Sequence, residues 1–158
     1  MCSGVSMNRI FLLGIILSVT GCATHDPRPF SGVDPALISY VRYWEDRADW
    51  NGGGVRAGYG FGITKGTSIG YCHYRSSYGK TYWWVTIKKS WWDTAEESTR
   101  LSLVGHEFGH CELSRGHKDS DSEFSDGCPD SLMRASVVSS RCFDAHEDYY
   151  VDELFGRL

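Results

Sequence analysis

The chain has 158 residues and a formal net charge of −4, which suits one domain. A hydrophobic fraction of 41% is ordinary for a globular protein and argues against disorder. Because the sequence has no block of Lys or Arg, nucleic acid is not an expected partner.

The first part of the chain has the pattern of an export signal. Residues 10–17 form an uncharged apolar run behind Arg9, too short to span a bilayer as a mature helix but suited to the core of a signal peptide. Small residues and then Cys22 follow, and this arrangement resembles the bacterial lipobox, where signal peptidase II cuts before a cysteine that carries lipid. The alternative is an uncleaved anchor helix with an incidental cysteine. We expect a signal peptide over 1–21, a lipidated tether over 22–33 and a folded domain over 34–158.

The residue after Cys22 is Ala23, so no Asp stands there to signal retention in the inner membrane. The resemblance therefore implies a lipid-anchored protein of the bacterial cell envelope, in the outer membrane and facing the periplasm.

Four further cysteines follow, and an even number in an oxidising compartment predicts two disulfides. A zinc site is the weaker interpretation, since no CxxC spacing is present. Among the three pairings that four cysteines allow, we favour Cys72 with Cys111 and Cys128 with Cys142.

The domain begins with a helix signal. Asp34-Pro35 is typical of an N-cap followed by proline in the first turn, and apolar residues then recur at helical spacing. We expect a helix over about 35–49, ended by the glycines at 52–54. Strand-like stretches follow at roughly 55–63, 68–74 and 82–89, and a turn at 76–79 joins the last two.

The second half predicts two more helices around a loop. Asp93 with Glu96 three residues later is typical of a capping box, and a helix follows to about Glu112. Residues 113–142 are rich in Ser, Asp and Gly and predict a long loop, usually functional or disordered. A last helix fits 144–156. The predicted fold is α+β: a mixed twisted sheet packed on a central helix, with a C-terminal helix. The aromatic clusters at 82–84 and 91–92 predict core packing, or alternatively a groove wall near the site.

The central helix contains the motif that carries the chemistry. His106-Glu107-Phe108-Gly109-His110 matches HExxH. Residues four apart share a helix face, so both imidazoles can bind one metal ion. The Glu107 carboxylate can reach a water molecule on that metal rather than the metal itself. The motif predicts a zinc site with Glu107 as the base.

A catalytic zinc ion keeps one position for water, so a third protein ligand is needed. His117 follows Gly116, and a glycine in the left-handed conformation can end the helix and swing His117 under the metal. The alternative for His117 is a surface histidine of the loop, and the other candidate ligands are Asp119, Asp121 and Glu123. His73 and His146 are expected to be surface or edge residues.

These residues resemble the metzincin group of zinc peptidases: HExxH, a glycine-led turn, a third histidine and a later Ser131-Leu132-Met133. The resemblance implies a zincin-like fold, Zn²⁺ bound by His106, His110 and His117, and a methionine turn at Met133. It implies hydrolysis of peptide bonds in a peptide or protein substrate by a zinc-bound water that Glu107 activates. It also implies that the substrate pairs with an edge strand, for which 68–74 is the candidate. Some members use a tyrosine as an oxyanion donor; for Tyr149 and Tyr150 we expect helix packing instead.

The chain departs from that group in one respect. The usual pattern is HExxHxxGxxH, whereas this chain reads HEFGHCELSRGH. The third histidine follows the second by one position more than usual, and Leu113 stands in place of the glycine. The wider pattern also resembles bacterial lipoproteins with HELGHC-type motifs, which supports the zinc site and names no substrate. The alternatives are a zinc amide hydrolase acting on cell-wall peptides and a lipid-anchored binding module with structural zinc. A structural site has no need of Glu107, which favours an enzyme.

Changing Cys22 tests the lipobox. We expect Cys22→Ala to remain uncleaved and to incorporate no lipid, because the sulfur that receives the acyl group is gone. Labelling of growing cells with a tagged fatty acid measures this, and Cys2→Ala is the matched control that keeps its label. Lipid-labelled Cys22→Ala protein of mature size would contradict the prediction.

Overall fold

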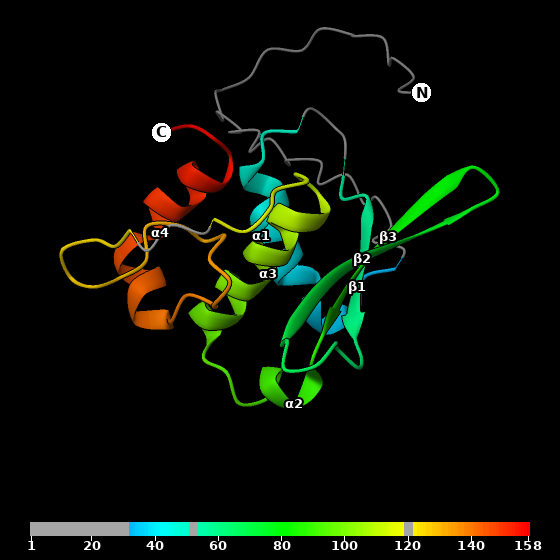
Figure 1. Cartoon of the computed structure of the whole chain (residues 1–158), viewed down its shortest axis with the longest axis horizontal. Helices are drawn as coiled ribbons and strands as arrows, with labels where there is room; N and C mark the ends of the chain where they lie inside the picture. Colours follow the sequence, from blue (N-terminus) through cyan, green and yellow to red (C-terminus); the bar gives the residue numbers. More distant parts are fainter. Residues whose placement is uncertain (1–31, 51–53, 119–121) are drawn as a thin grey trace, which may run out of the picture.

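The computed structural model describes residues 32–50, 54–118 and 122–158 and shows a three-stranded sheet packed against helices (Figure 1). A short 3-10 helix, Pro35–Leu37, leads into α1, Ile38–Arg47. The other elements in chain order are β1 Ala57–Phe61, β2 Gly70–Ser77, β3 Lys80–Ile87, α2 Lys89–Trp92, α3 Glu97–Cys111 and α4 Ser140–Leu154. This confirms the predicted α+β class, with a mixed sheet, a central helix and a C-terminal helix.

The described chain enters the fold beside β1. The Tyr59 amide donates to the Gly32 carbonyl (2.9 Å), and the Asp34 amide donates to the Tyr59 carbonyl (2.7 Å). The backbone on either side of Val33 is thus hydrogen-bonded to β1. The Asp34 side chain accepts from the Ala36 amide, which caps the first turn as the Asp34-Pro35 pattern predicts.

The strands β2 and β3 extend further towards their turn than the sequence predicted. Ser77 pairs with Lys80, and the two residues between them, Tyr78 and Gly79, have φ of +51° and +73°. Two positive φ values make the two-residue turn whose twist suits a hairpin. The turn expected over 76–79 is thus partly strand, because a tyrosine in the left-handed region is not a turn signal in sequence.

The strand order β1-β3-β2 makes β2 an edge strand in the described part of the chain, as predicted for 68–74. β1 is parallel and β2 antiparallel to β3. Successive residues point to opposite faces, so the sheet has an inner face towards α3 and an outer face. Val85 and its partner Cys72 lie on the inner face, where Val85 is fully buried and Cys72 is bonded to α3.

The capping-box prediction was wrong, since α3 begins at Glu97 rather than just after Asp93. Asp93 ends the turn of α2 and pairs with Lys89. Glu96 is the N-cap of α3, but its side chain makes no capping hydrogen bond. Trp92 is buried against aromatic rings of α1 and β1, and this packing holds α2 as a separate helical turn.

Two glycines allow α3 to lie at the centre of the fold. A Cβ on Gly105 would collide with the ring of Trp44 from α1, and a Cβ on Gly109 would collide with Met133. The Trp44 indole N–H also donates to the Leu101 carbonyl (2.9 Å). Side chains thus close around α3 on two sides, and β2 and α4 contact it as well.

Two disulfides join the elements in the pairing that we favoured: Cys72 of β2 with Cys111 of α3, and Cys128 of the loop with Cys142 of α4. The buried apolar core runs from Val33 to Leu154. A chain that begins at residue 23 therefore retains this whole core and both disulfides. Among the described residues, no helix combines the length and the apolar character needed to cross a membrane.

The segment between α3 and α4 is a long loop, as predicted. Its described part has one isolated bridge, between Glu123 and Pro129. α4 begins at Ser140, earlier than the predicted 144, because the Ser139 side chain accepts from the Cys142 amide and caps the helix.

Glu112 fastens the end of α3 to the start of β1. Its side chain is only 1% exposed. One carboxylate oxygen accepts from the Ala57 amide (2.9 Å) and the Tyr59 hydroxyl (3.3 Å), and the other accepts from the Arg56 amide (2.9 Å). All three donors depend on this one carboxylate, which makes it a structural group.

We expect Glu112→Ala to lower the free energy of unfolding by about 3 kcal/mol, because buried donors lose their acceptor. The exposed Glu96, whose side chain caps nothing, is the matched control, and Glu96→Ala should change stability by less than about 0.5 kcal/mol. Denaturant unfolding of the chain from residue 23 measures both. Equal stability of the two variants would contradict the structural role of Glu112.

Candidate metal centre

α3 carries His106 and His110 one turn apart on the same face, as the HExxH spacing predicts. Their Nε2 atoms lie 3.0 Å apart, and the Nε2 atom of His117 lies 3.3 Å from that of His106. The structure therefore brings the three predicted ligands into one group that can hold a metal ion.

Backbone carbonyls fix the orientation of two of the rings. Nδ1–H of His106 donates to the Leu132 carbonyl oxygen (2.9 Å), and Nδ1–H of His110 donates to that of Arg115 (2.7 Å). A carbonyl oxygen only accepts, so Nδ1 holds the proton and Nε2 of each neutral ring presents a lone pair. Burial lowers the pKa of His106 to about 4 and also lowers the pKa of His110, which keeps both rings neutral. Two lone pairs at 3.0 Å repel unless a cation lies between them, and a metal ion meets that need.

His117 reaches the group through a turn that the sequence predicted at the wrong residue. Ser114 has the left-handed φ of +57°, whereas Gly116 does not have a positive φ. Because α3 already ends at Cys111, the chain reverses before it reaches the glycine. The predicted role of Gly116 was therefore wrong, although His117 does join His106 and His110.

The residues on either side of His117 hold this turn in place. The Arg115 guanidinium donates to the Glu153 carbonyl at the end of α4 (2.9 Å) and pairs with the Glu153 carboxylate (2.5 Å). The Lys118 amide donates to the Met133 carbonyl (2.8 Å). His117 itself is exposed, so its position depends on these flanking contacts rather than on burial.

Glu107 lies beneath the start of β2. It is 3% exposed, and a Cβ on Gly70 would collide with its carboxylate, so the glycine provides the room. Burial raises the pKa of Glu107 to about 8, and a hydrogen bond from the Cys72 backbone opposes this rise. Oε2 of Glu107 is buried without a hydrogen-bond partner among the described residues. A buried carboxylate oxygen of this kind is suited to a ligand or a proton from outside the chain.

The three histidines and Glu107 line one groove of about 740 Å³. Residues 67–72, at the start of β2, form one part of its lining, and the loop residues 135–137 form another. Trp83 also lines the groove, whereas Trp92 is buried in the core. The aromatic clusters therefore include a ring of the groove wall, Trp83, and a ring of the core, Trp92.

Met133 is fully buried and packs against Gly109, so it lies against the helix that carries the histidines. Among the other candidate ligands, Glu123 is exposed and is not part of the histidine group. Asp119 and Asp121 lie outside the described residues. Tyr149 packs on Phe124 and does not line the groove.

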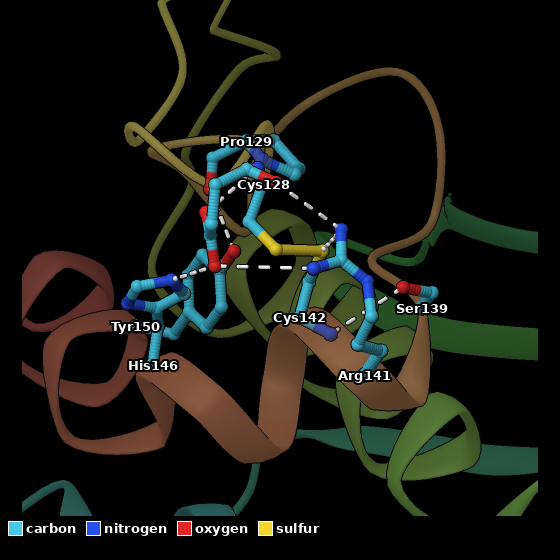
Figure 2. A network of polar contacts seen from close by, with 8 residues as sticks. Cys128, Pro129, Ser139, Arg141, Cys142, His146 and Tyr150 are labelled. Atoms are coloured by element: carbon cyan, nitrogen blue, oxygen red, sulfur yellow. Dashed lines mark hydrogen bonds and ion pairs between the residues drawn. A yellow bond between two sulfur atoms is a disulfide. The ribbon is translucent and has the colours of Figure 1, made fainter.

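A second set of potential ligands, Asp126, Cys128 and His146, has a structural role (Figure 2). Cys128 forms a disulfide with α4 and offers no thiolate. His146 lies 3.0 Å from Asp126, and this hydrogen bond lowers the pKa of the Asp126 carboxyl. The Tyr150 hydroxyl donates to the Pro129 carbonyl (2.6 Å). These contacts fasten the loop to α4, so Tyr150 has the expected packing role.

Sequence reasoning missed the contacts that support the site. Arg115 is a single basic residue in a loop, and its partner Glu153 is 38 residues further along the chain. Gly70 offered no signal because the need for a glycine arises only when Glu107 packs beneath it. Such contacts depend on tertiary structure, which the spacing of residues in sequence does not show.

Comparisons with protein-family models, with curated proteins and with solved structures find no match to this chain.

We expect His117→Ala to weaken binding of a divalent metal at least about 100-fold. Loss of a residue that only hydrogen-bonds to a metal ligand can weaken binding by up to about 100-fold, and His117 is a candidate ligand itself. His73, which pairs with Trp84 on the sheet, supplies the matched control, and His73→Ala should bind metal normally. Competition with a chelator and elemental analysis of the chain from residue 23 measure both variants. Normal binding by His117→Ala would assign the third position to another residue.

Proposed function

We propose that the protein is a zinc-dependent metallopeptidase in which His106, His110 and His117 hold the metal and Glu107 is the general base. One observation carries the proposal: three histidine nitrogens gather in a groove that is also lined by a buried carboxylate without a partner for Oε2 among the described residues. A site built only for stability has no need of that carboxylate, since it would leave a polar atom unsatisfied at a cost of about 1–3 kcal/mol.

The ligand set fits zinc. Neutral imidazoles suit Zn²⁺, and zinc–nitrogen bonds of about 2.0–2.1 Å in a tetrahedral site place the nitrogens about 3.3 Å apart. The Nε2 atoms of His110 and His117 lie 3.0 and 3.3 Å from that of His106. The carbonyls of Leu132 and Arg115 accept from the remaining ring N–H groups, an arrangement that commonly orients histidine ligands.

Bound zinc would polarise the carbonyl of the substrate and lower the pKa of water towards about 7. Beside a bound zinc ion the Glu107 carboxyl would be ionised despite its raised pKa, because a nearby cation favours the charged form. The carboxylate would then accept the proton of the attacking water and return it to the leaving amine. The backbone hydrogen bond from Cys72 holds the carboxylate, and burial shields it from bulk water. Met133 supports the helix beneath and takes no part in proton transfer.

The proposed substrate is an extended peptide. β2 is an edge strand in the described chain, and residues 67–72 line the groove. Free backbone groups on such an edge can pair with a peptide and align it along the groove. A lipid anchor at Cys22, which lies outside the described residues, would place this activity in the cell envelope.

We expect Glu107→Gln to lower peptide hydrolysis about 10²–10⁴-fold while the bound zinc remains, because the amide cannot accept the proton. Turnover of a peptide library, measured beside zinc content, checks this. Glu123→Gln, at an exposed acid outside the group, is the control and should behave like the wild type. Undiminished turnover by Glu107→Gln would remove Glu107 from its role; a zinc-loaded wild type that cleaves no peptide would contradict the peptidase itself.

A further inference from the structure

The β2–β3 hairpin exposes aromatic side chains that take no part in the core. Tyr78 at the turn is fully exposed, and Tyr82 and Trp84 are 59% and 42% exposed. The far end of the hairpin extends away from the helices (Figure 1). Single exposed apolar residues are common, but a contiguous group of large rings marks a contact surface.

The register of the strands gathers rings and cations on the outer face. Paired residues point to the same side of the sheet, and the pairs Arg75–Tyr82 and His73–Trp84 lie opposite to the inner-face pair Cys72–Val85. We define the hairpin surface as Tyr71, Arg75, Tyr78, Lys80, Tyr82 and Trp84. Lys80 pairs with Ser77 and so lies on the same face.

The hairpin surface is positively charged although the protein as a whole is acidic. From Trp50 to Trp92 the sequence has no Asp or Glu, so all 20 acidic residues lie elsewhere. The basic residues of this stretch are Arg56, Lys65, Arg75, Lys80, Lys88 and Lys89. Arg75 and Lys80 are exposed, and neither forms an ion pair within the described ranges.

The start of the described chain lies against the same surface. A Cβ on Gly32 would contact the ring of Trp84, and the Gly32 carbonyl accepts a hydrogen bond from the Tyr59 amide of β1. Only about ten residues separate Gly32 from Cys22, and a chain of that length spans at most about 35 Å when extended. An anchor at Cys22 would thus keep this surface close to the lipid.

We propose that the hairpin surface docks on the anionic headgroups of a phospholipid membrane. Tyr and Trp rings favour the depth of the headgroups, and each Lys or Arg near an anionic surface adds to binding. The inference does not depend on the peptidase proposal. Tyr71 belongs to the hairpin surface and also lines the groove, so docking would hold the groove beside the membrane.

Sedimentation with vesicles tests the docking without the lipid anchor. The chain from residue 23 with Cys22 absent retains the whole described core, and it is mixed with vesicles of equal phosphatidylglycerol and phosphatidylcholine or of phosphatidylcholine alone. We expect at least about 10-fold stronger binding to the anionic vesicles, and an Arg75→Glu/Lys80→Glu variant should lose at least about 10-fold. The matched control, Arg134→Glu/Arg141→Glu, changes the net charge equally in the helical half and should bind as the wild type does.

A Tyr78→Ser/Tyr82→Ser variant, which keeps the net charge, should also bind the anionic vesicles more weakly. Near-UV circular dichroism confirms that each variant is folded. Wild-type binding by both hairpin variants, or an equal loss in the control, would overturn the proposal. Binding to heparin without binding to vesicles would also overturn it, because the surface would then serve a soluble polyanion. Zinc content and peptide turnover are measured separately, so either proposal can fail alone.

Discussion

Three histidine nitrogens gathered at one position, two of which present lone pairs there, are the constraint around which this site is arranged. Such a group is unfavourable without a cation, so each ring must be held against the repulsion of its neighbours. The support comes from segments far apart in the chain: Leu132 accepts from His106, and Arg115 accepts from His110. Arg115 in turn is bonded to the end of α4. The C-terminal helix therefore helps to form the site although it contributes no ligand.

Two buried glutamates, Glu107 on α3 and Glu112 just after it, differ in whether their carboxylate oxygens have hydrogen-bond partners. Glu112 and Glu107 are both buried, and burial raises the pKa of each. Glu112 accepts from three donors at the start of β1 and is satisfied by the protein. Glu107 keeps one oxygen without a partner in the described chain. Because that unsatisfied oxygen belongs to a residue that lines the groove together with the three histidines, Glu107 rather than Glu112 is the candidate base.

The sequence predicted correctly those features that depend only on local geometry. The spacing of His106 and His110 needs only a helix to bring the rings together, and Asp34-Pro35 needs only its own turn to form a cap. The predictions for Gly116 and Asp93 were wrong because tertiary packing decides where a helix ends or begins. The chain reverses direction after α3 at Ser114, and the buried Trp92 holds α2 as a helical turn separate from α3. The register of β2 and β3 was equally inaccessible, so the faces of the hairpin could not be assigned.

The distribution of charge gives the molecule two unlike halves. The stretch from Trp50 to Trp92, which contains the three strands, is basic and aromatic, and the acidic residues lie elsewhere in the chain. A membrane with anionic headgroups would attract the first half and repel the second, which orients the molecule as well as binding it. The groove lies where the halves meet, since β2 and α3 both line it. Docking through the outer face would leave the groove between membrane and helices, where a polypeptide at the membrane surface can enter along β2, an edge strand in the described part of the chain.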